Sequence, residues 1–305
     1  MTCSKFRNRR DFEGSGCSLN GKGMLYLVAT PIGNLEDITL RALRVLKEVD
    51  LIAAEDTRQT IKLLNHFQIS KPLISYYEHN KHEKGRYIVS QILEGKNVAL
   101  VSDAGTPGIS DPGEDLVKLC VQNDIVVSSL PGPVAAISAL IISGLPTGQF
   151  SFEGFLSINK RNRRQHLERI KNDTRTLIFY EAPHKLYQTL NDLREIMGNR
   201  NISIARELTK IHEEVIRCTL EEAIEKYEKE SPKGEFVLVL EGADVQNVKQ
   251  DQVQQWNDIS IQDHVNMYIS EGLDSKEALK RVAKDRGISK REVYSMQLSH
   301  KKVNK

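Results

Sequence analysis

The chain has little of several residue types whose presence would mark a particular class of protein. It contains only four cysteines in 305 residues, at Cys3, Cys17, Cys120 and Cys218. They lie far apart and form no Cys-x-x-Cys pair, which indicates neither a disulfide framework nor a zinc site. The histidines show no ligand spacing beyond His79-x-x-His82, and no apolar run reaches the roughly 18 to 20 residues of a membrane span. We therefore expect a cytoplasmic protein without a membrane segment or a bound metal.

Neither sign of charge dominates, because the formal net charge at pH 7 is only +2. The positive residues are nevertheless unevenly distributed. Residues 160–164, Lys-Arg-Asn-Arg-Arg, begin a basic cluster that is opposed only by Glu168 and Asp173. Such a cluster is able to follow phosphate groups, which favours a nucleic-acid partner. The alternative is an ordinary solvated surface, on which mixed charges are normal.

Hydrophobic periodicity divides the chain into five parts. Residues 1–22 are polar, basic and dotted with glycine, so we expect a disordered tail there and not a secretory signal. Residues 24–145 and 148–242 alternate short β-rich runs with longer amphipathic runs, which predicts two α/β domains built from βαβ units. Residues 243–258, rich in Gln and Asp, are typical of a linker, and a helical segment follows at 259–300.

The β-rich runs of the first domain predict a mainly parallel sheet, because a helix-period segment separates each run from the next. One such segment, residues 37–47, is predicted to be a helix with an apolar face. In the second domain Thr219 and Glu222 form a capping box, which predicts a helix over 221–228. The predicted strands are residues 25–29, 51–54, 73–75, 98–101 and 125–127 in the first domain, and 176–180, 202–205 and 236–240 in the second.

Two helices and a turn are predicted near the C-terminus. Ser260 and Asp274 each precede an acidic residue by three positions, which is typical of helix starts. Ala283, Gly287 and Val293 follow with the spacing of a helix-turn-helix, in which the glycine makes the turn. We therefore predict a small helix-turn-helix-like appendage, and simple helix packing is the alternative.

The most unusual segment is residues 100–113, Leu-Val-Ser-Asp-Ala-Gly-Thr-Pro-Gly-Ile-Ser-Asp-Pro-Gly, which leaves the end of a predicted strand. Its glycines allow the backbone to approach a ligand closely, and Pro107 and Pro112 stiffen it. The chain has neither the Gly-Lys-Ser/Thr nor the Gly-x-Gly-x-x-Gly of common phosphate-binding loops. Asp103 would repel a phosphate but suits a ligand with amine or hydroxyl groups. A tight turn without a ligand is the alternative.

Three further loops are expected at the same edge of the sheet. Residues 30–34, 54–58 and 130–135 each follow a predicted strand. Parallel strands direct their carboxyl ends to one edge, where open α/β sheets bind ligands. The four loops therefore predict one shared ligand site.

Seven segments of the chain, taken in order, resemble the motifs of a known family. They are LYLVATPIGNL (25–35), AAEDTR (53–58), LVSDAGTPGISDPG (100–113), PGP (131–133), FEGFL (152–156), YEAPH (180–184) and GEFVLVLEG (234–242). Over roughly residues 24–242 the sequence is similar to the bacterial 16S rRNA (cytidine-2′-O)-methyltransferases, the RsmI group within the tetrapyrrole methylase superfamily. The helical appendage also fits this group.

The resemblance implies an α/β fold of two domains, with a parallel sheet in the first and a mixed sheet in the second. It also implies a homodimer, and S-adenosylmethionine as a cofactor held between the domains. The superfamily commonly has Gly-Asp-Pro after its fourth strand, whereas this chain has Gly-Thr-Pro, so that Asp103 is the candidate for the missing carboxylate. The positions that match cofactor contacts are Pro31, Ile32, Asp103, Ala104, Gly105, Thr106, Pro107, Pro133, Val134, Tyr180, Ala205 and Gly234.

The implied reaction needs a base, because a ribose 2′-hydroxyl is a poor nucleophile until its proton is removed. Glu55, Asp56, Glu181 and His184 are the four candidates. Asp56 is also able to cap the following helix, and Glu181 to pair with a base such as Arg206, so structural roles stay open. The residues that we expect to contact substrate RNA are Arg58, Lys160, Arg161, Arg163 and Arg164.

Three functional hypotheses differ in the substrate that they require. The favoured one is S-adenosylmethionine-dependent 2′-O-methylation of a decoding-centre cytidine in the 16S rRNA of the small ribosomal subunit. The basic cluster supports it, because an RNA enzyme must bind phosphates around its target. A small-molecule methyltransferase acting on a tetrapyrrole would not need that cluster. A nonenzymatic nucleic-acid binder would need only residues 258–305, and would leave the four loops unexplained.

Overall fold

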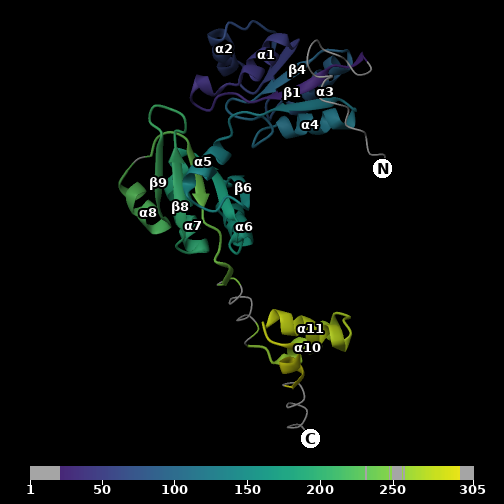
Figure 1. Cartoon of the computed structure of the whole chain (residues 1–305), viewed down its shortest axis with the longest axis vertical. Coiled ribbons are helices and arrows are strands. Elements are labelled where there is room, and N and C mark those ends of the chain that lie inside the picture. The colour runs from purple at the N-terminus through teal and green to yellow at the C-terminus, as the bar shows by residue number, and fades with distance from the viewer. Residues whose placement is uncertain (1–20, 231, 247, 249–255, 257, 296–305) are drawn as a thin grey trace.

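Two five-stranded sheets, one after the other in the sequence, dominate the described part of the chain (Figure 1). The computed structural model describes residues 21–295, apart from residues 231, 247, 249–255 and 257. The predicted tail at 1–22 lies almost entirely outside the described residues, as do much of the predicted linker and the end of the predicted appendage. No helix within the described ranges is long and apolar enough to cross a membrane.

The first sheet is fully parallel, with the strand order β3-β2-β4-β1-β5. This arrangement confirms the parallel sheet predicted from the alternating pattern. The strands are β1 (Met24–Val28), β2 (Leu51–Ala54), β3 (Leu73–Ser75), β4 (Val98–Val101) and β5 (Val126–Leu130). The helices between them are α1 (Leu40–Glu48), α2 (Thr57–His66), α3 (Lys81–Leu93) and α4 (Gly113–Gln122).

Helices cover both faces of the first sheet, because successive side chains of a strand point to opposite sides. Ile52 and Ala54 pack in one core with α1 and α2, whereas Ala53 packs in another core with α3 and α4. Strands that are buried on both faces have continuous apolar sequences. This burial explains why β2 and β4, whose residues are all buried, are readily recognised in the sequence.

The second sheet is mixed, with the strand order β6-β7-β10-β8-β9. Only β6 and β7 are parallel to one another, and the other neighbours are antiparallel. The mixed sheet implied by the family resemblance is thus confirmed. Its strands are β6 (Phe150–Phe155), β7 (Thr176–Glu181), β8 (Asn201–Arg206), β9 (Glu214–Thr219) and β10 (Phe236–Leu240). One face packs against α6 (Lys160–Ile170), α7 (Leu186–Met197) and α8 (Leu220–Lys229), and the other against α5 (Ala135–Ser143).

Helix α5 connects the two sheets. It follows β5 in the sequence, but Ala136, Ala139 and Leu140 pack in one core with Ile178 and Val239 of the second sheet. The first domain expected from the sequence ends at residue 145, after this helix. Helix α5 therefore belongs to the core of the second sheet, although it precedes every strand of that sheet in the sequence.

Side-chain caps determine where two of the predicted helices begin. The capping box of Thr219 and Glu222 is present, and α8 starts immediately after Thr219. The helix predicted over 37–47 starts instead at Leu40 as α1. The Thr39 hydroxyl accepts a hydrogen bond from the Ala42 amide at 3.1 Å, which fixes the helix start at this point. The preceding residues form a separate 3-10 helix, η3 (Leu35–Asp37).

Strands β6 and β9 are absent from the strands predicted by sequence. Strand β6 has a bulge between Phe152 and Gly154, which interrupts the alternation of side chains. Strand β9 is an edge strand whose residues are at least partly exposed, so that it has no continuous apolar run.

The described C-terminal residues form a small helical group beyond the second sheet (Figure 1). Gly287 has a φ of +62° and makes the turn between two helices. Ala283 and Val293 lie on either side of this turn and are buried in one core, as the helix-turn-helix spacing predicts. The helices are α10 (Ile261–Ser270) and α11 (Ser275–Asp285), which begin at the predicted caps Ser260 and Asp274, and residues 290–295.

Candidate cofactor and substrate site

A cavity of about 420 Å³ is lined by residues from both sheets. This volume lies within the range of roughly 300 to 1,000 Å³ that is usual for cofactor and small-molecule sites. The first sheet contributes the loops after β1, β2, β4 and β5, which are the four loops predicted to share one site. The second sheet contributes the ends of β6 and β7, the start of β10 and the loop after β8. The predicted meeting of the four loops is therefore confirmed.

Hydrogen bonds join the loop after β4 to its neighbours. Gly105 exchanges two backbone hydrogen bonds with Thr30, at N···O distances of 2.9 and 3.0 Å. The Thr106 hydroxyl donates to the Pro133 carbonyl oxygen at 3.0 Å. Gly105 has a φ of +82°, which favours glycine, and a Cβ there would lie 3.4 Å from the Ile32 side chain. These contacts hold the loop in place without help from a ligand.

Asp111 organises the second half of the same loop. Its carboxylate accepts hydrogen bonds from the amides of Gly108 at 2.9 Å and Gly113 at 2.7 Å. A Cβ on Gly113 would lie 2.8 Å from the Gly108 nitrogen, so a larger residue does not fit there. Burial raises the pKa of Asp111 above its usual value. In this half of the loop, the absence of a side chain at Gly113 allows its backbone to lie close to the backbone of Gly108.

Most of the residues that match cofactor contacts line the cavity, and the others lie nearby or in the core. Pro107 and Ala205 are buried. Gly234 has a φ of +94°, and a Cβ there would lie 2.5 Å from the Glu207 side chain. The residues that line the cavity are Ile32, Asp103, Ala104, Gly105, Thr106, Val134 and Tyr180, whereas Pro31, Pro107, Pro133, Ala205 and Gly234 do not.

Carboxylates dominate the charged lining of the cavity. Glu55, Asp103, Asp111, Glu181 and Glu235 line it, and no described lysine or arginine does. Burial raises the pKa of Glu55, and the nearby charge of Asp103 adds to this effect. Because like charges repel, such a lining disfavours a phosphate ligand and favours a cation.

Two of the four candidate bases do not line the cavity. The Asp56 carboxylate caps α2, where it accepts hydrogen bonds from the Arg58 amide at 2.8 Å and from the Arg58 guanidinium at 2.7 Å. These hydrogen bonds lower the pKa of Asp56 to about 2, which makes it a weak base. His184 is exposed in the 3-10 helix η4 (Pro183–Lys185). Asp56 therefore has the geometry of a helix cap, which is the structural role that the sequence left open for it.

Glu181 lines the cavity but is held by its own domain. It is only 3% exposed, and its carboxylate accepts hydrogen bonds from the Thr189 hydroxyl at 2.5 Å and from the Ala182 amide at 2.9 Å. The suggested pairing with Arg206 is wrong, because Arg206 pairs with Glu214 on β9 at 3.2 Å. Glu55 is thus the remaining candidate that lines the cavity and neither caps a helix nor binds a hydroxyl.

The structure contradicts the expected RNA contact of Arg163. Its side chain is 6% exposed, and its Nε pairs with the Asp192 carboxylate at 2.6 Å. The guanidinium also donates to the carbonyl oxygens of Ser157 and Ile158. Arg163 shares the buried side of α6 with Leu167, so the helical period turns it away from the surface.

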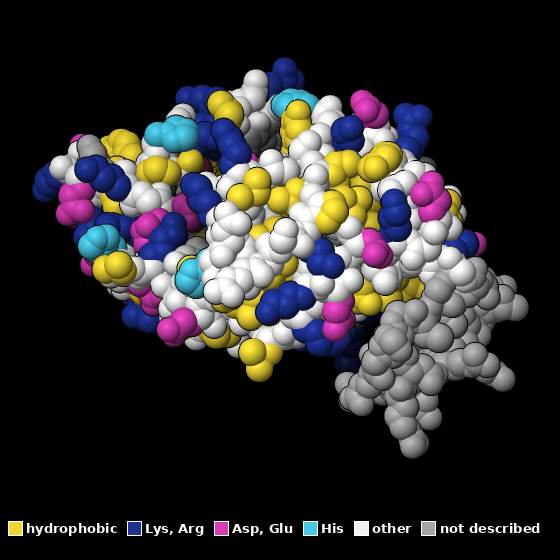
Figure 2. All heavy atoms as spheres, turned by 90° about the horizontal axis from the view of Figure 1, so that it is seen from above, with side chains coloured by type: hydrophobic (Ala, Val, Ile, Leu, Met, Phe, Trp, Pro, Cys, Tyr) yellow, Lys and Arg dark blue, Asp and Glu magenta, His cyan; other side chains and the backbone are white. Residues whose placement is uncertain are grey.

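The other basic residues of the cluster remain at the surface. Lys160 and Arg161 are exposed in the first turn of α6, and Arg164 pairs with Glu195 at 2.7 Å. Arg58 has an 86% exposed side chain and pairs with Asp56. Figure 2, which views the molecule from the side of the first sheet, shows lysine and arginine side chains dispersed among acidic and apolar ones. This face therefore presents no single basic patch among its described residues.

Several residues that line the cavity are missing from the predicted site. Phe155 belongs to the FEGFL motif and Ile109 to the long loop, so that each had a signal in the sequence. Val237 belongs to the GEFVLVLEG motif, whereas Leu208 lies outside every motif, and nothing in its local sequence indicates a ligand. Only the folding of one sheet against the other brings both residues to the cavity.

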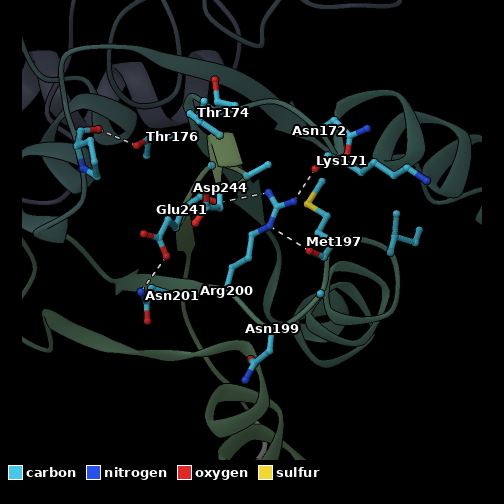
Figure 3. Close-up of a pocket in the computed structure, with 16 residues that line it drawn as sticks. Lys171, Asn172, Thr174, Thr176, Met197, Asn199, Arg200, Asn201, Glu241 and Asp244 are labelled. Atoms are coloured by element: carbon cyan, nitrogen blue, oxygen red, sulfur yellow. Dashed lines mark hydrogen bonds between the residues drawn. The ribbon is translucent and has the colours of Figure 1, made fainter. Parts of the chain in front are cut away.

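A second hollow, of about 800 Å³, lies at the opposite end of the second sheet (Figure 3). Here Arg200 donates hydrogen bonds to the backbone carbonyl oxygens of Lys171, Met197 and Glu241. Lys171 and Met197 lie at the C-terminal ends of α6 and α7, where a cation stabilises the unpaired carbonyl groups. Arg200 thus has a structural role, and the convergent strand-end loops make the smaller cavity the candidate site.

Comparison with known proteins identifies the family. Residues 24–224 match the family model of the Tetrapyrrole (Corrin/Porphyrin) Methylases. The chain belongs to this family. The chain is 54% identical to the ribosomal RNA small subunit methyltransferase I of Halalkalibacterium halodurans. The aligned region is 275 residues long and covers 90% of this chain and 94% of that protein. The protein of the same name from Bacillus subtilis is 50% identical, over 91% of this chain and 96% of its own length. These matches confirm the resemblance carried by the sequence motifs.

Solved structures confirm the tetrapyrrole methylase fold. Diphthine synthase superposes with a TM-score of 0.57 at 14% identity, over 77% of this chain and 96% of that one. The uroporphyrin-III C-methyltransferase of Thermus thermophilus, complexed with S-adenyl homocysteine, gives a TM-score of 0.51 at 18% identity, over 71% and 97%. Identities this low show a shared fold and leave the choice of substrate to other evidence.

Proposed function

We propose that the chain is an S-adenosylmethionine-dependent methyltransferase of the 16S rRNA, and that its acceptor is the ribose 2′-oxygen of a decoding-centre cytidine. The observation that carries this proposal is the identity of 50 to 54% with ribosomal RNA small subunit methyltransferases over at least nine tenths of the chain. The uroporphyrin enzyme, by contrast, shares the fold at 18% identity. The cavity is formed by residues 32–237 alone, which argues against a nucleic-acid binder that uses only its C-terminal helices.

The lining of the cavity fits the cofactor. S-adenosylmethionine supplies a methyl group on a positively charged sulfonium, and it also carries an ammonium group. Asp103 and the backbone of Gly105 would hold it from the first sheet, and Tyr180 from the second. The Tyr180 hydroxyl accepts a hydrogen bond from the Ala136 amide at 3.2 Å, which fixes its ring at the cavity. The carboxylates favour a cationic cofactor over a phosphate-bearing one.

Glu55 is the proposed general base. It lines the cavity at the end of β2, and burial raises its pKa, so that its carboxylate accepts a proton more readily than an exposed glutamate does. Lys160 and Arg161 are the proposed phosphate contacts, because they are exposed at the start of α6. Arg58 is a further contact, since its guanidinium extends into solvent beside the end of β2.

The homodimer and the cytoplasmic location implied by the family and the composition are part of the same proposal. Ile137 and Ile141, on α5, are 40% and 68% exposed, and provide an apolar surface for a second copy of the chain. Light scattering during size-exclusion chromatography, with Ile141→Lys as the variant, distinguishes a dimer from a monomer.

The activity is tested with small ribosomal subunits that lack 2′-O-methyl groups. Labelled S-adenosylmethionine is supplied, and the modified nucleotide is mapped. Gly105→Arg should abolish transfer, since its side chain would enter the cavity, whereas Gly148→Arg should be active because nothing lies within 4 Å of a Cβ at residue 148. Label on one decoding-centre ribose supports the proposal. Cofactor binding without RNA labelling would instead favour a small-molecule acceptor.

A further inference from the structure

The cavity contains an exposed aromatic ring. Phe155 lines the cavity and is 57% exposed, although the buried core of the same sheet lies directly beneath the strand that carries it. Exposing a large apolar side chain to solvent at a cavity is unfavourable in the free protein. A ligand that covers the ring would recover this free energy.

A β-bulge places the ring on the cavity side of the sheet. The pairing of β6 with β7 shifts by one residue between Phe152 and Gly154. A shift of one residue turns every later side chain to the other face, so that Phe155 comes to lie beside Tyr180. Without the bulge, Phe155 would point into the core beneath α6 and α7. The chain has therefore turned outward a residue that ordinary strand geometry would bury.

The bulge lies close to the loop after β4. Gly154 has a φ of +64°, and a Cβ there would lie 3.4 Å from the Ser110 hydroxyl oxygen. Ser110 also has a φ of +64°, belongs to the loop after β4 and lines the cavity. Backbone conformations that are rare for most residues thus occur on both sides of the cavity, next to Phe155.

Neighbouring rings hold Phe155 in position. Its ring makes an edge-to-face contact with Tyr180, at a centroid distance of 5.5 Å and an interplanar angle of 61°. Tyr180 makes a similar contact with Phe152, at 5.0 Å and 70°. Such pairs limit the motion of an aromatic side chain. The exposed part of Phe155 is therefore a preformed surface at the opening of the cavity.

We propose that Phe155 is the surface on which the target base of the RNA stacks after it leaves its own helix. This inference rests on the proposed function, because an enzyme that reaches one ribose in a structured RNA must splay that nucleotide out. Unstacked bases are commonly held on aromatic side chains. Lys160 and Arg161 are exposed a few residues further along the chain, where they are able to bind the flanking phosphates.

The test compares RNA recognition with cofactor binding in Phe155→Leu. Stacking of one base on an aromatic ring contributes enough that its loss should raise the KM for small ribosomal subunits roughly 5- to 150-fold. The Kd for S-adenosylmethionine, measured by calorimetry, should be unchanged. Phe155→Trp should restore a low KM. Phe150→Leu is the matched control, because Phe150 is 40% exposed on the same strand but does not line the cavity.

Each result has a defined meaning. A weaker cofactor Kd with an unchanged KM for subunits would place the ring against the cofactor and overturn the proposal. Normal constants for Phe155→Leu, in a preparation whose wild-type protein methylates subunits, would overturn the stacking alone. A wild-type protein that leaves the subunits unmethylated would overturn the proposed function, and this inference with it.

Discussion

The ion pair between Arg163 of α6 and Asp192 of α7 has side chains that are only 6% and 8% exposed. Burying either charge alone costs several kcal/mol, and the partner offsets that cost. The Asp192 carboxylate accepts from Nε of the guanidinium, and two backbone carbonyl groups accept from Nη1. The pair therefore joins two helices at a position where the sequence alone indicates a surface arginine.

Asp192→Ala should lower the free energy of unfolding by about 3 to 5 kcal/mol, because it leaves Arg163 buried without a counter-charge. Urea denaturation measures this loss. Arg164→Leu is the control: it removes the exposed pair with Glu195, and its effect should be far smaller. Equal losses in the two variants would contradict the structural role assigned to Arg163.

Glu55 gives the reaction a pH dependence of defined sign. Its pKa is raised by burial and then by Asp103, and only the ionised carboxylate accepts a proton. The kcat/KM should therefore rise with pH through a pKa above the usual glutamate value of about 4.3 and then level off. Glu55→Gln should lose roughly 10²- to 10⁴-fold in rate, together with this acid limb.

Two further variants test whether Glu55, and not another group, produces the acid limb of the pH profile. Asp103→Asn removes one source of the raised pKa and should move the limb to lower pH. Glu235→Gln alters another carboxylate of the cavity and should leave the limb in place. An acid limb that persists unchanged in Glu55→Gln would assign the base to a different group.

At the scale of elements, the loop after β1 touches the loop between β8 and β9. A Cβ on Gly33 would lie 2.5 Å from the Lys210 side chain and 2.8 Å from the Leu208 carbonyl oxygen. Glu207 and Thr209 have φ values of +51° and +64°, so the second loop is already in a constrained conformation. Since Leu208 lines the cavity, this contact helps to set the distance between its two walls.

Gly33→Ala should lower kcat/KM by up to roughly 10²-fold, because a displacement of about 1 Å near a reacting centre has effects of that size. Steady-state kinetics with small subunits measures it. Gly148→Ala should have wild-type kinetics, since a Cβ at residue 148 meets nothing within 4 Å. Wild-type kinetics for Gly33→Ala as well would show that the two loops adjust without consequence.

The elements most accurately predicted from the sequence are those whose environment is uniform. Strand β2 is buried on both faces, and its predicted and observed bounds coincide. Strand β6 contains Gly154 in a left-handed conformation and faces a cavity, so that its local pattern resembles a loop. The four loops of the first sheet were also predictable, because the direction of parallel strands fixes the edge at which they meet.

The contributions of the second sheet to the site were less predictable. Glu181 bonds to Thr189, eight residues along the chain, and the side of α7 that faces β7 determines this pairing. Arg163 differs from Arg161 only by its position around α6. The Glu181–Thr189 hydrogen bond and the burial of Arg163 both depend on how a helix is rotated relative to the sheet. The types of residue in the sequence do not determine this rotation by themselves.

At the scale of the whole molecule, the helical appendage is separate from the cavity. The residues that line the cavity lie between 32 and 237, whereas the first helix of the appendage begins at Ile261. Removal of residues 246–305 should therefore leave the Kd for S-adenosylmethionine unchanged and raise the KM for small subunits. Calorimetry and steady-state kinetics measure the two constants. Loss of cofactor binding would show that the appendage supports the cavity, and full RNA affinity in residues 258–305 alone would favour the nonenzymatic binder.

Helix α5 determines where the chain can be cut into two fragments that each keep their apolar surfaces covered. A fragment that ends at residue 145 would display the apolar side of α5 with no sheet to cover it, and would invite aggregation. In the complementary fragment, Ile178 and Val237 would be exposed to solvent on the face of the sheet that α5 normally covers. A junction before Val134 instead leaves α5 with the strands that it covers. Chimaeras between relatives, and split halves intended to reassemble, should therefore be joined ahead of this helix.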